Sequence, residues 1–110
     1  MNNSKRKRLE RDGWAIGGAA DVLQLSDEEA CFIELKLALA AGVRELRESR
    51  GLTQTALATR LGSSQSRVAK MEAGDRSVSL DLLVRSLLNI GASPAEIAKW
   101  IKRAETNRAA

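Results

Sequence analysis

The chain has 110 residues, 44% of them hydrophobic and 29% charged, which allows one domain with a single core. It contains no histidine and one cysteine, Cys31, which excludes a His-based catalytic triad, an internal disulfide and a thiolate cluster for zinc or iron–sulfur. The net charge is +4, but residues 1–12 and 99–110 carry +3 each and the remainder carries −2, so charge alone does not identify a nucleic-acid-binding protein.

The N-terminal segment, residues 1–25, differs in composition from the rest of the chain. Its first twelve residues are polar and basic, and the run Lys5 to Arg8 suits either a solvated tail or an arm that binds phosphates. Trp14 and Ile16 follow between glycines, and suit a segment that docks on the body of the protein. We therefore expect a basic arm and docking segment at 1–25, a domain at 26–106 and a C-terminal tail at 107–110.

Five helices are predicted from Ser26 onward by their start and stop signals. Ser and Thr side chains that can cap a helix N-terminus alternate with glycines that can close a helix in the left-handed conformation. Ser26 and Glu29 form a capping box, and Pro94 follows Ser93 at the first position of the last helix. The predicted helices cover residues 27–50, 54–61, 65–73, 80–90 and 94–105. No strand is predicted there, so the fold class is all-α.

The first predicted helix has two apolar faces. The first face comprises Phe32, Leu35, Leu39, Val43 and Leu46, at spacings of three and four. The second face comprises Ile33, Leu37 and Ala41. The first face suits packing on the remaining helices, whereas the second is either part of a wide core face or a subunit contact.

Residues 54–73 combine the features that two short helices joined by a tight turn require. Ala58 is small enough for a close crossing, and Gly62 accepts the positive φ of the turn. Val68 and Met71 lie three residues apart and can bury the second helix. Leu57 and Leu61 can face the same core from the first helix. Together these residues predict a helix–turn–helix unit.

Residues 43–91 resemble the Xre-type, lambda-repressor-like DNA-binding domains. The resemblance rests on Leu46-Arg47, Gly51-Leu52-Thr53-Gln54, Leu57-Ala58, Leu61-Gly62, Ser63 to Val68, Met71 to Gly74, and Leu80, Leu83 and Leu87. One departure is Ser63, where the family more often has a larger or apolar residue. The resemblance implies a five-helix lambda-repressor-like helix-turn-helix domain, here with an extra N-terminal arm and a long first helix. A wider pattern from Trp14 to Leu37 is similar to small Xre proteins of the HigA antitoxin kind.

In such units the second helix, here 65–73, lies in the major groove with its N-terminal residues at base edges. Gln65 can form two hydrogen bonds to adenine N6 and N7, and Lys70 can donate to guanine O6 and N7. By resemblance, Gln54 donates to a phosphate; Arg76 is a further phosphate candidate. Outside this frame, the same polar side chains would be interpreted as solvated helix positions. The predicted DNA-binding residues are Gln54, Ser64, Gln65, Ser66, Arg67 (to a base or a phosphate), Lys70 and Arg76.

Two further observations fit this interpretation. Arg47 and Glu72 resemble the buried ion pair with which these domains tie the first helix to the recognition helix. We expect this pair to orient the helix and to add little net stability. Residues 53–76 carry four cations and two acids, so this region is locally positive on a mildly acidic body.

The leading hypothesis is a sequence-specific transcriptional regulator of the repressor kind that binds double-stranded DNA as a homodimer on an inverted repeat. One helix–turn–helix reads only a few base pairs, so useful affinity requires two. The dimer surface is then either the second face of the first helix or the last helix with Ile97, Trp100 and Ile101, although Trp100 also suits the core. The alternative is an antitoxin that neutralises a partner toxin through the segment with Trp14 and Ile16.

An enzyme is rejected, because no nucleophile, base or phosphate loop stands at a workable spacing. We likewise expect no cofactor, no metal and no ligand pocket in so small a chain. The longest apolar run, from Leu37 to Val43, is far shorter than the roughly 20 residues of a membrane span. A lone thiol suits a reducing compartment, so we expect a cytoplasmic, DNA-associated protein.

Overall fold

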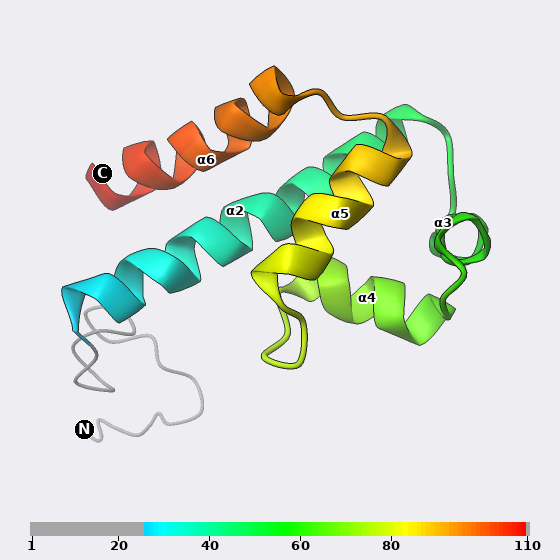
Figure 1. Ribbon diagram of the computed structural model, residues 1–110, viewed down its shortest axis with the longest axis horizontal. Helices are drawn as coiled ribbons and strands as arrows, with labels where there is room; N and C mark the ends of the chain where they lie inside the picture. The colour runs from blue at the N-terminus through cyan, green and yellow to red at the C-terminus, as the bar shows by residue number, and fades with distance from the viewer. Residues whose placement is uncertain (1–25, 110) are drawn as a thin grey trace. The chain divides into compact units, whose positions relative to one another are not determined.

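A computed structural model describes residues 26–109, which form five α-helices and no strand (Figure 1). The helices are α2 (Asp27–Ser49), α3 (Gln54–Leu61), α4 (Gln65–Ala73), α5 (Leu80–Ile90) and α6 (Pro94–Ala109). The predicted all-α fold is confirmed for this part of the chain. The arm and docking segment predicted at 1–25 lies outside the described residues.

The helix bounds match the prediction except at two ends. α2 ends at Ser49, one residue early, and α6 continues to Ala109 instead of ending at 105. Residues 107–109, expected to form a tail, are therefore helical. The physical reason is that no glycine or proline follows Pro94, so nothing in the sequence stops the last helix.

The helix N-termini are capped by the side chains that the sequence provides for this purpose. In α3 the Thr53 hydroxyl accepts a hydrogen bond from the Ala56 N–H at 3.0 Å, and in α5 the Ser79 hydroxyl accepts from Leu82 at 3.0 Å. α6 begins with a reciprocal capping box: the Ser93 N–H donates to Glu96 at 2.9 Å, and the Glu96 N–H donates back to the Ser93 hydroxyl at 3.1 Å. These caps fix where each helix begins.

The chain divides into two units, and residues 35–109 belong to the larger one. The core of the larger unit is aliphatic, as the near absence of aromatic residues requires. All five helices contribute to it, with Leu39 and Val43 from α2, Leu57 from α3, Val68 and Met71 from α4, Leu83 and Leu87 from α5, and Trp100 from α6. On the second apolar face of α2, Leu37 and Ala41 are exposed, so these two residues lie outside the core.

Helix α6 lies beside α2 and contacts it through Trp100 (Figure 1). The indole ring packs over Gly42, where a Cβ atom would lie 2.7 Å from the ring, so only glycine permits this approach. The indole N–H donates to the Glu45 carboxylate at 3.4 Å. Trp100 is thus a core residue, and Ile97 is buried beside it. Of the three apolar residues considered for a dimer surface on α6, only Ile101 is exposed.

Candidate nucleic-acid interface

Helices α3 and α4 pack against each other and are joined by a tight turn. Gly62 closes α3 with a φ of +66°, a conformation that side chains with a Cβ atom rarely adopt. The following N–H of Ser63 donates to the Ala58 carbonyl at 2.8 Å, which satisfies the end of the helix. Leu57 and Ala58 are buried at the crossing. The predicted helix–turn–helix unit is therefore confirmed.

Helix α4 has one buried face and one exposed face. Val68 and Met71 are almost fully buried and hold the helix on the core. The residues at its N-terminal end are exposed, and so is Lys70 one turn further on. The exposed side chains predicted to contact DNA on or just before this helix are Ser64, Gln65, Ser66, Arg67 and Lys70.

A chain of hydrogen bonds connects the core to the exposed end of α4. Arg47 of α2 donates to the Glu72 carboxylate from Nε at 2.5 Å and from Nη2 at 3.1 Å. The same carboxylate accepts from Gln54 Nε2 at 3.1 Å, and Gln54 Oε1 accepts from Gln65 Nε2 at 2.6 Å. The first residue of α4 is thus tied, through the first residue of α3, to the ion pair beneath them.

The carboxylate determines which way both amides point. Because ionised Glu72 can only accept, Gln54 must present its NH2 group to it and its oxygen to Gln65. Gln65 then donates one N–H to Gln54, and its second N–H and its oxygen remain available to another partner. One remaining donor and one remaining acceptor are what adenine N7 and N6 require. Gln54 likewise keeps a second N–H, which a phosphate oxygen can accept.

The ion pair beneath these amides is shielded from water. The side chain of Arg47 is 11% exposed and that of Glu72 is 5% exposed. Arg47 also donates from Nη1 to the Leu52 carbonyl at 2.8 Å, which ties the end of α2 to the start of the next segment. The hydrogen bond to Glu72 raises the pKa of Arg47, against the opposing effect of burial. The guanidinium therefore stays charged and holds Glu72 in place.

The remaining predicted contacts occupy different surroundings. Ser64 is the N-cap of α4, its hydroxyl oxygen accepting from the Arg67 N–H at 3.2 Å, and the two hydroxyls of Ser64 and Ser66 lie 3.3 Å apart. Arg76 is exposed in the loop after α4. Neither Arg67 nor Arg76 forms an ion pair with another residue of the described part.

The loop after α4 is ordered by Asp75. Its carboxylate accepts from the Ser77 hydroxyl at 2.5 Å and from the Ser77 N–H at 2.9 Å. These hydrogen bonds, and to a lesser degree the charges of Lys70 and Lys36, lower the pKa of Asp75. These hydrogen bonds therefore fix the conformation of the loop on either side of Arg76. Asp75 was not among the residues predicted from the sequence.

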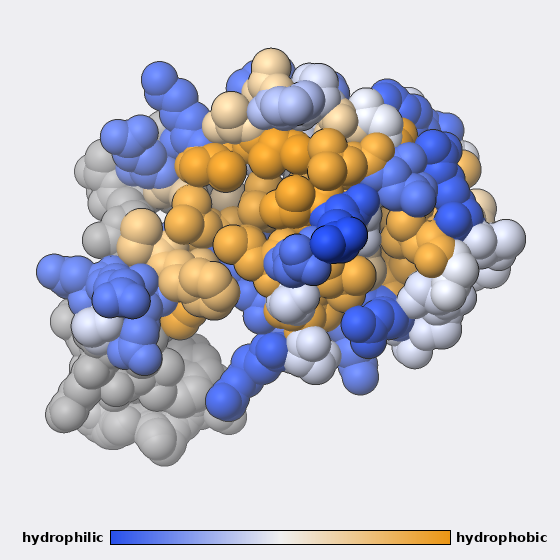
Figure 2. Space-filling view, in the orientation of Figure 1, coloured by the Kyte–Doolittle hydropathy of each residue, from blue (hydrophilic) through white to orange (hydrophobic). Residues whose placement is uncertain are grey.

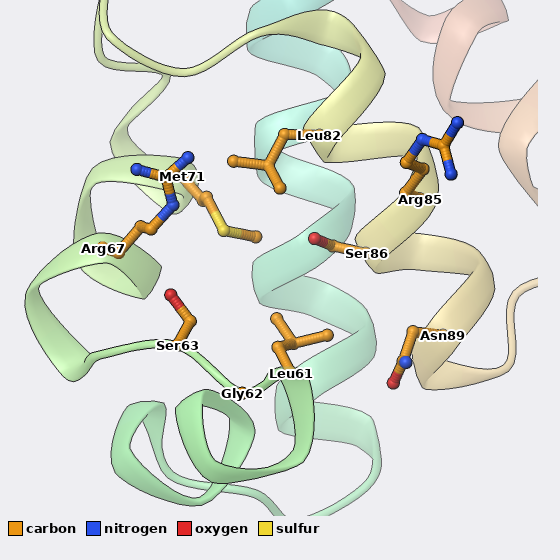
Figure 3. A pocket seen from close by; sticks show the side chains of 9 residues that line it. All are labelled: Leu61, Gly62, Ser63, Arg67, Met71, Leu82, Arg85, Ser86 and Asn89. Carbon is orange, nitrogen blue, oxygen red and sulfur yellow. The ribbon is translucent and has the colours of Figure 1, made fainter.

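A pocket of about 310 Å³ lies between the turn of the unit, α4 and α5 (Figure 3). No such pocket was predicted from the sequence. The small Ser63 at the turn lines this space, and Leu61 beside it is only half-buried. Arg67, which was assigned to DNA alone, also lines this pocket. The lining residues are Leu61, Gly62, Ser63, Arg67, Met71, Leu82, Arg85, Ser86 and Asn89.

An all-α domain that exposes the N-terminal end of the second helix of a helix–turn–helix defines a class of DNA-binding regulators. The family model described as "Helix-turn-helix" matches residues 43–97, half of the chain, and the chain belongs to this Xre-like helix-turn-helix family. No curated protein and no solved structure matches the chain. Within residues 26–109, no helix is both long enough and apolar enough to cross a membrane.

Proposed function

We propose that this protein is a sequence-specific transcriptional repressor that binds an inverted DNA repeat as a homodimer, with α4 in the major groove. The observation that carries the proposal is the orientation of the Gln65 amide. Its neighbour Gln54 and the buried pair behind it leave one donor and one acceptor available at the exposed end of α4. An amide held in this way loses little further freedom when it meets an adenine.

Other polar side chains on α4 and beside it supply further base and phosphate contacts under this proposal. Lys70 is exposed one turn after Gln65 and suits guanine O6 and N7. The remaining N–H of Gln54 and the guanidinium of Arg76 suit phosphates on either side. Gln54 lies at the N-terminus of α3, where the helix dipole also favours a phosphate.

The homodimer follows from the small reach of one recognition helix, and the surface offers apolar residues for it. Leu88 on α5 is 48% exposed and Ile101 on α6 is 40% exposed. Figure 2 shows apolar side chains gathered between α6 and α5 and over α2 in this view, with hydrophilic side chains over the middle of α5. A dimer that covers two neighbouring major grooves keeps other proteins from that DNA, which is how a protein this small represses transcription.

The test begins with selection of bound duplexes from a randomised DNA library, followed by fluorescence anisotropy. We expect an inverted repeat whose half-site centres lie about one helical turn apart. Gln65→Ala should weaken binding to the selected site by about tenfold or more, corresponding to 1–3 kcal/mol, and should leave binding to random DNA almost unchanged. Lys99→Ala, which removes an exposed cation on α6, serves as the control and should not change this ratio.

Two results would count against the proposal. One is that selection enriches no sequence. The other is that Gln65→Ala reduces binding to the selected and the random duplex equally, since that would make the amide a general contact.

The antitoxin hypothesis concerns residues 1–25, which lie outside the described residues. It predicts a neighbouring gene for a small basic RNase-like toxin, whose growth arrest is relieved by co-expression of the full chain. Deletion of residues 1–25 should then restore the arrest while operator binding remains. If the shortened chain still relieves the arrest, the segment is not the neutralising element.

A further inference from the structure

The pocket beside the helix–turn–helix has features of a ligand site that, Arg67 apart, the DNA-binding function does not use. Its volume of about 310 Å³ lies at the lower end of the range for small-molecule sites. Apolar side chains from three helices, Leu61, Met71 and Leu82, form its walls (Figure 3). Polar groups lie among and around them, so the pocket is amphipathic.

The first of these polar groups is the hydroxyl of Ser86 on α5. This residue is only 3% exposed, and its side chain makes no hydrogen bond to any other described residue. Figure 3 shows its oxygen directed into the space between Met71, Leu82 and Leu61. Buried helical serines usually bond to a carbonyl one turn earlier, and a buried hydroxyl without a partner is unfavourable. The hydroxyl is therefore available to a molecule in the pocket.

The remaining polar groups of the pocket are mainly donors. Arg60 donates from Nε to the Asn89 side-chain oxygen at 3.2 Å, which leaves the NH2 group of Asn89 unused. Arg67 forms no ion pair within the described residues. Arg85 donates only from its Nε to the Asp81 carboxylate, and this ion pair is weak because both side chains are exposed. None of the lining residues is acidic. The pocket thus attracts an anion.

We infer that this pocket binds a small amphipathic carboxylate. Its carboxylate pairs with the Arg67 guanidinium at one side of the pocket, its apolar body packs against Leu61, Met71 and Leu82, and the Ser86 hydroxyl on the other side of Met71 is available to a second polar group of the ligand. A carboxylate fits better than a bare inorganic anion, because the walls of the pocket are apolar.

Occupation of the pocket has a consequence that rests on the proposed function. Arg67 lies on α4, among the residues proposed to contact DNA, and a carboxylate paired with it withdraws this cation from the DNA. The carboxylate also brings a negative charge close to the phosphates. The ligand and the DNA are therefore expected to weaken each other's binding reciprocally.

The binding test uses the full chain without DNA and records ¹H–¹⁵N NMR spectra during titration with isovalerate, benzoate and phenylacetate. Benzamide, which has the shape of benzoate without its charge, is the matched control ligand. We expect saturable shifts of the pocket amides with at least one acid and none with benzamide. Arg67→Gln should weaken binding about tenfold, the loss expected for a charge-assisted pair. Arg44→Gln removes an exposed arginine of α2 and should change nothing.

Ser63→Leu provides a second variant, because a larger apolar side chain at the turn fills the pocket without removing a polar partner. It should abolish the shifts while the protein keeps its helical circular dichroism. The inference is overturned if no acid of the three gives saturable pocket shifts. It is also overturned if benzamide binds as well as benzoate, or if Ser63→Leu leaves the titration unchanged.

A separate measurement decides the effect on DNA. Binding of the selected duplex is measured with and without the acid at a saturating concentration. The affinity should fall several-fold for the natural chain and stay constant for Ser63→Leu. Equal affinities in a protein that does bind the acid would overturn the coupling. Because the NMR titration contains no DNA, a failure of the DNA-binding proposal cannot be mistaken for a failure of the pocket.

Discussion

At the scale of single residues, the Glu72 carboxylate organises the candidate site. It accepts three hydrogen bonds, two from Arg47 and one from Gln54. Glu72→Gln replaces an acceptor-only group with an amide and removes the buried counter-ion of Arg47, which then keeps only the half-exposed Glu48, at 3.7 Å from its Nη2. We expect a loss of about 3 kcal/mol in the free energy of unfolding, measured with urea. Asp81→Asn, which breaks an ion pair to Arg85 whose two side chains are about three-quarters exposed, is the control and should change stability by less than about 0.5 kcal/mol.

The contact between Gln54 and Gln65 predicts non-additive effects on DNA binding. If Gln54 orients Gln65, then Gln65→Ala removes most of what Gln54 contributes through that contact. The double variant should therefore lose less binding free energy than the two single variants together, by about 0.5 kcal/mol or more, in anisotropy with the selected duplex. Strict additivity would show that the two amides act independently.

Asp75 gives a prediction about pH. Hydrogen bonds from Ser77 lower its pKa in the folded chain, so the stability they confer is present above the unfolded pKa and is lost as the pH falls through the folded one. Ser77→Ala removes the hydroxyl and should move the Asp75 pKa upward, toward its ordinary value. A ¹³C NMR titration of the carboxyl carbon measures this shift. An unchanged titration midpoint would contradict the assignment of the cause.

At the scale of elements, the packing of α6 on α2 depends on Gly42. Alanine normally stabilises a helix interior by about 1 kcal/mol relative to glycine. Here the added Cβ atom would lie 2.7 Å from the Trp100 ring, so Gly42→Ala should lower the melting temperature. Ala41→Gly, at the exposed neighbouring position, measures the propensity effect alone. A melting temperature that rises with Gly42→Ala would contradict the close contact.

The elements themselves could be predicted because their signals are local. Thr53, Ser64 and Ser79 cap helices within a few residues of themselves, and Gly62 and Gly74 end helices by their own backbone conformation. The end of α6 was missed because the sequence there contains no stop signal at all.

The site could be predicted only in part, because its geometry joins distant residues. Gln54 and Gln65 were singled out by their places at helix starts, but nothing in their spacing indicates that they bond to each other or to Glu72. The pocket was missed for a similar reason. Ser63 stood out as unusual, but the consequence depends on Ser86 of α5, which only the folded chain brings to the same space.

At the scale of the whole molecule, the proposed dimer predicts both mass and salt dependence. Sedimentation at micromolar concentration should give twice the mass of the 11.9 kDa chain, and a monomer would count against the dimer. Binding should weaken with salt as counterions are released from the phosphates. Arg76→Ala should reduce the slope of log K against log salt by about 2, because a dimer loses one phosphate contact from each chain. An unchanged slope would show that Arg76 does not contact a phosphate.

The central claim is that the oriented amide of Gln65 reads an adenine in the major groove. The most direct test replaces single adenines of the selected site with 7-deazaadenine, which lacks only the N7 acceptor. Replacement at one position of each half-site should lower the affinity of the natural chain about tenfold. The same replacement should leave the affinity of the Gln65→Ala variant unchanged. If every position affects both proteins equally, Gln65 does not read the base.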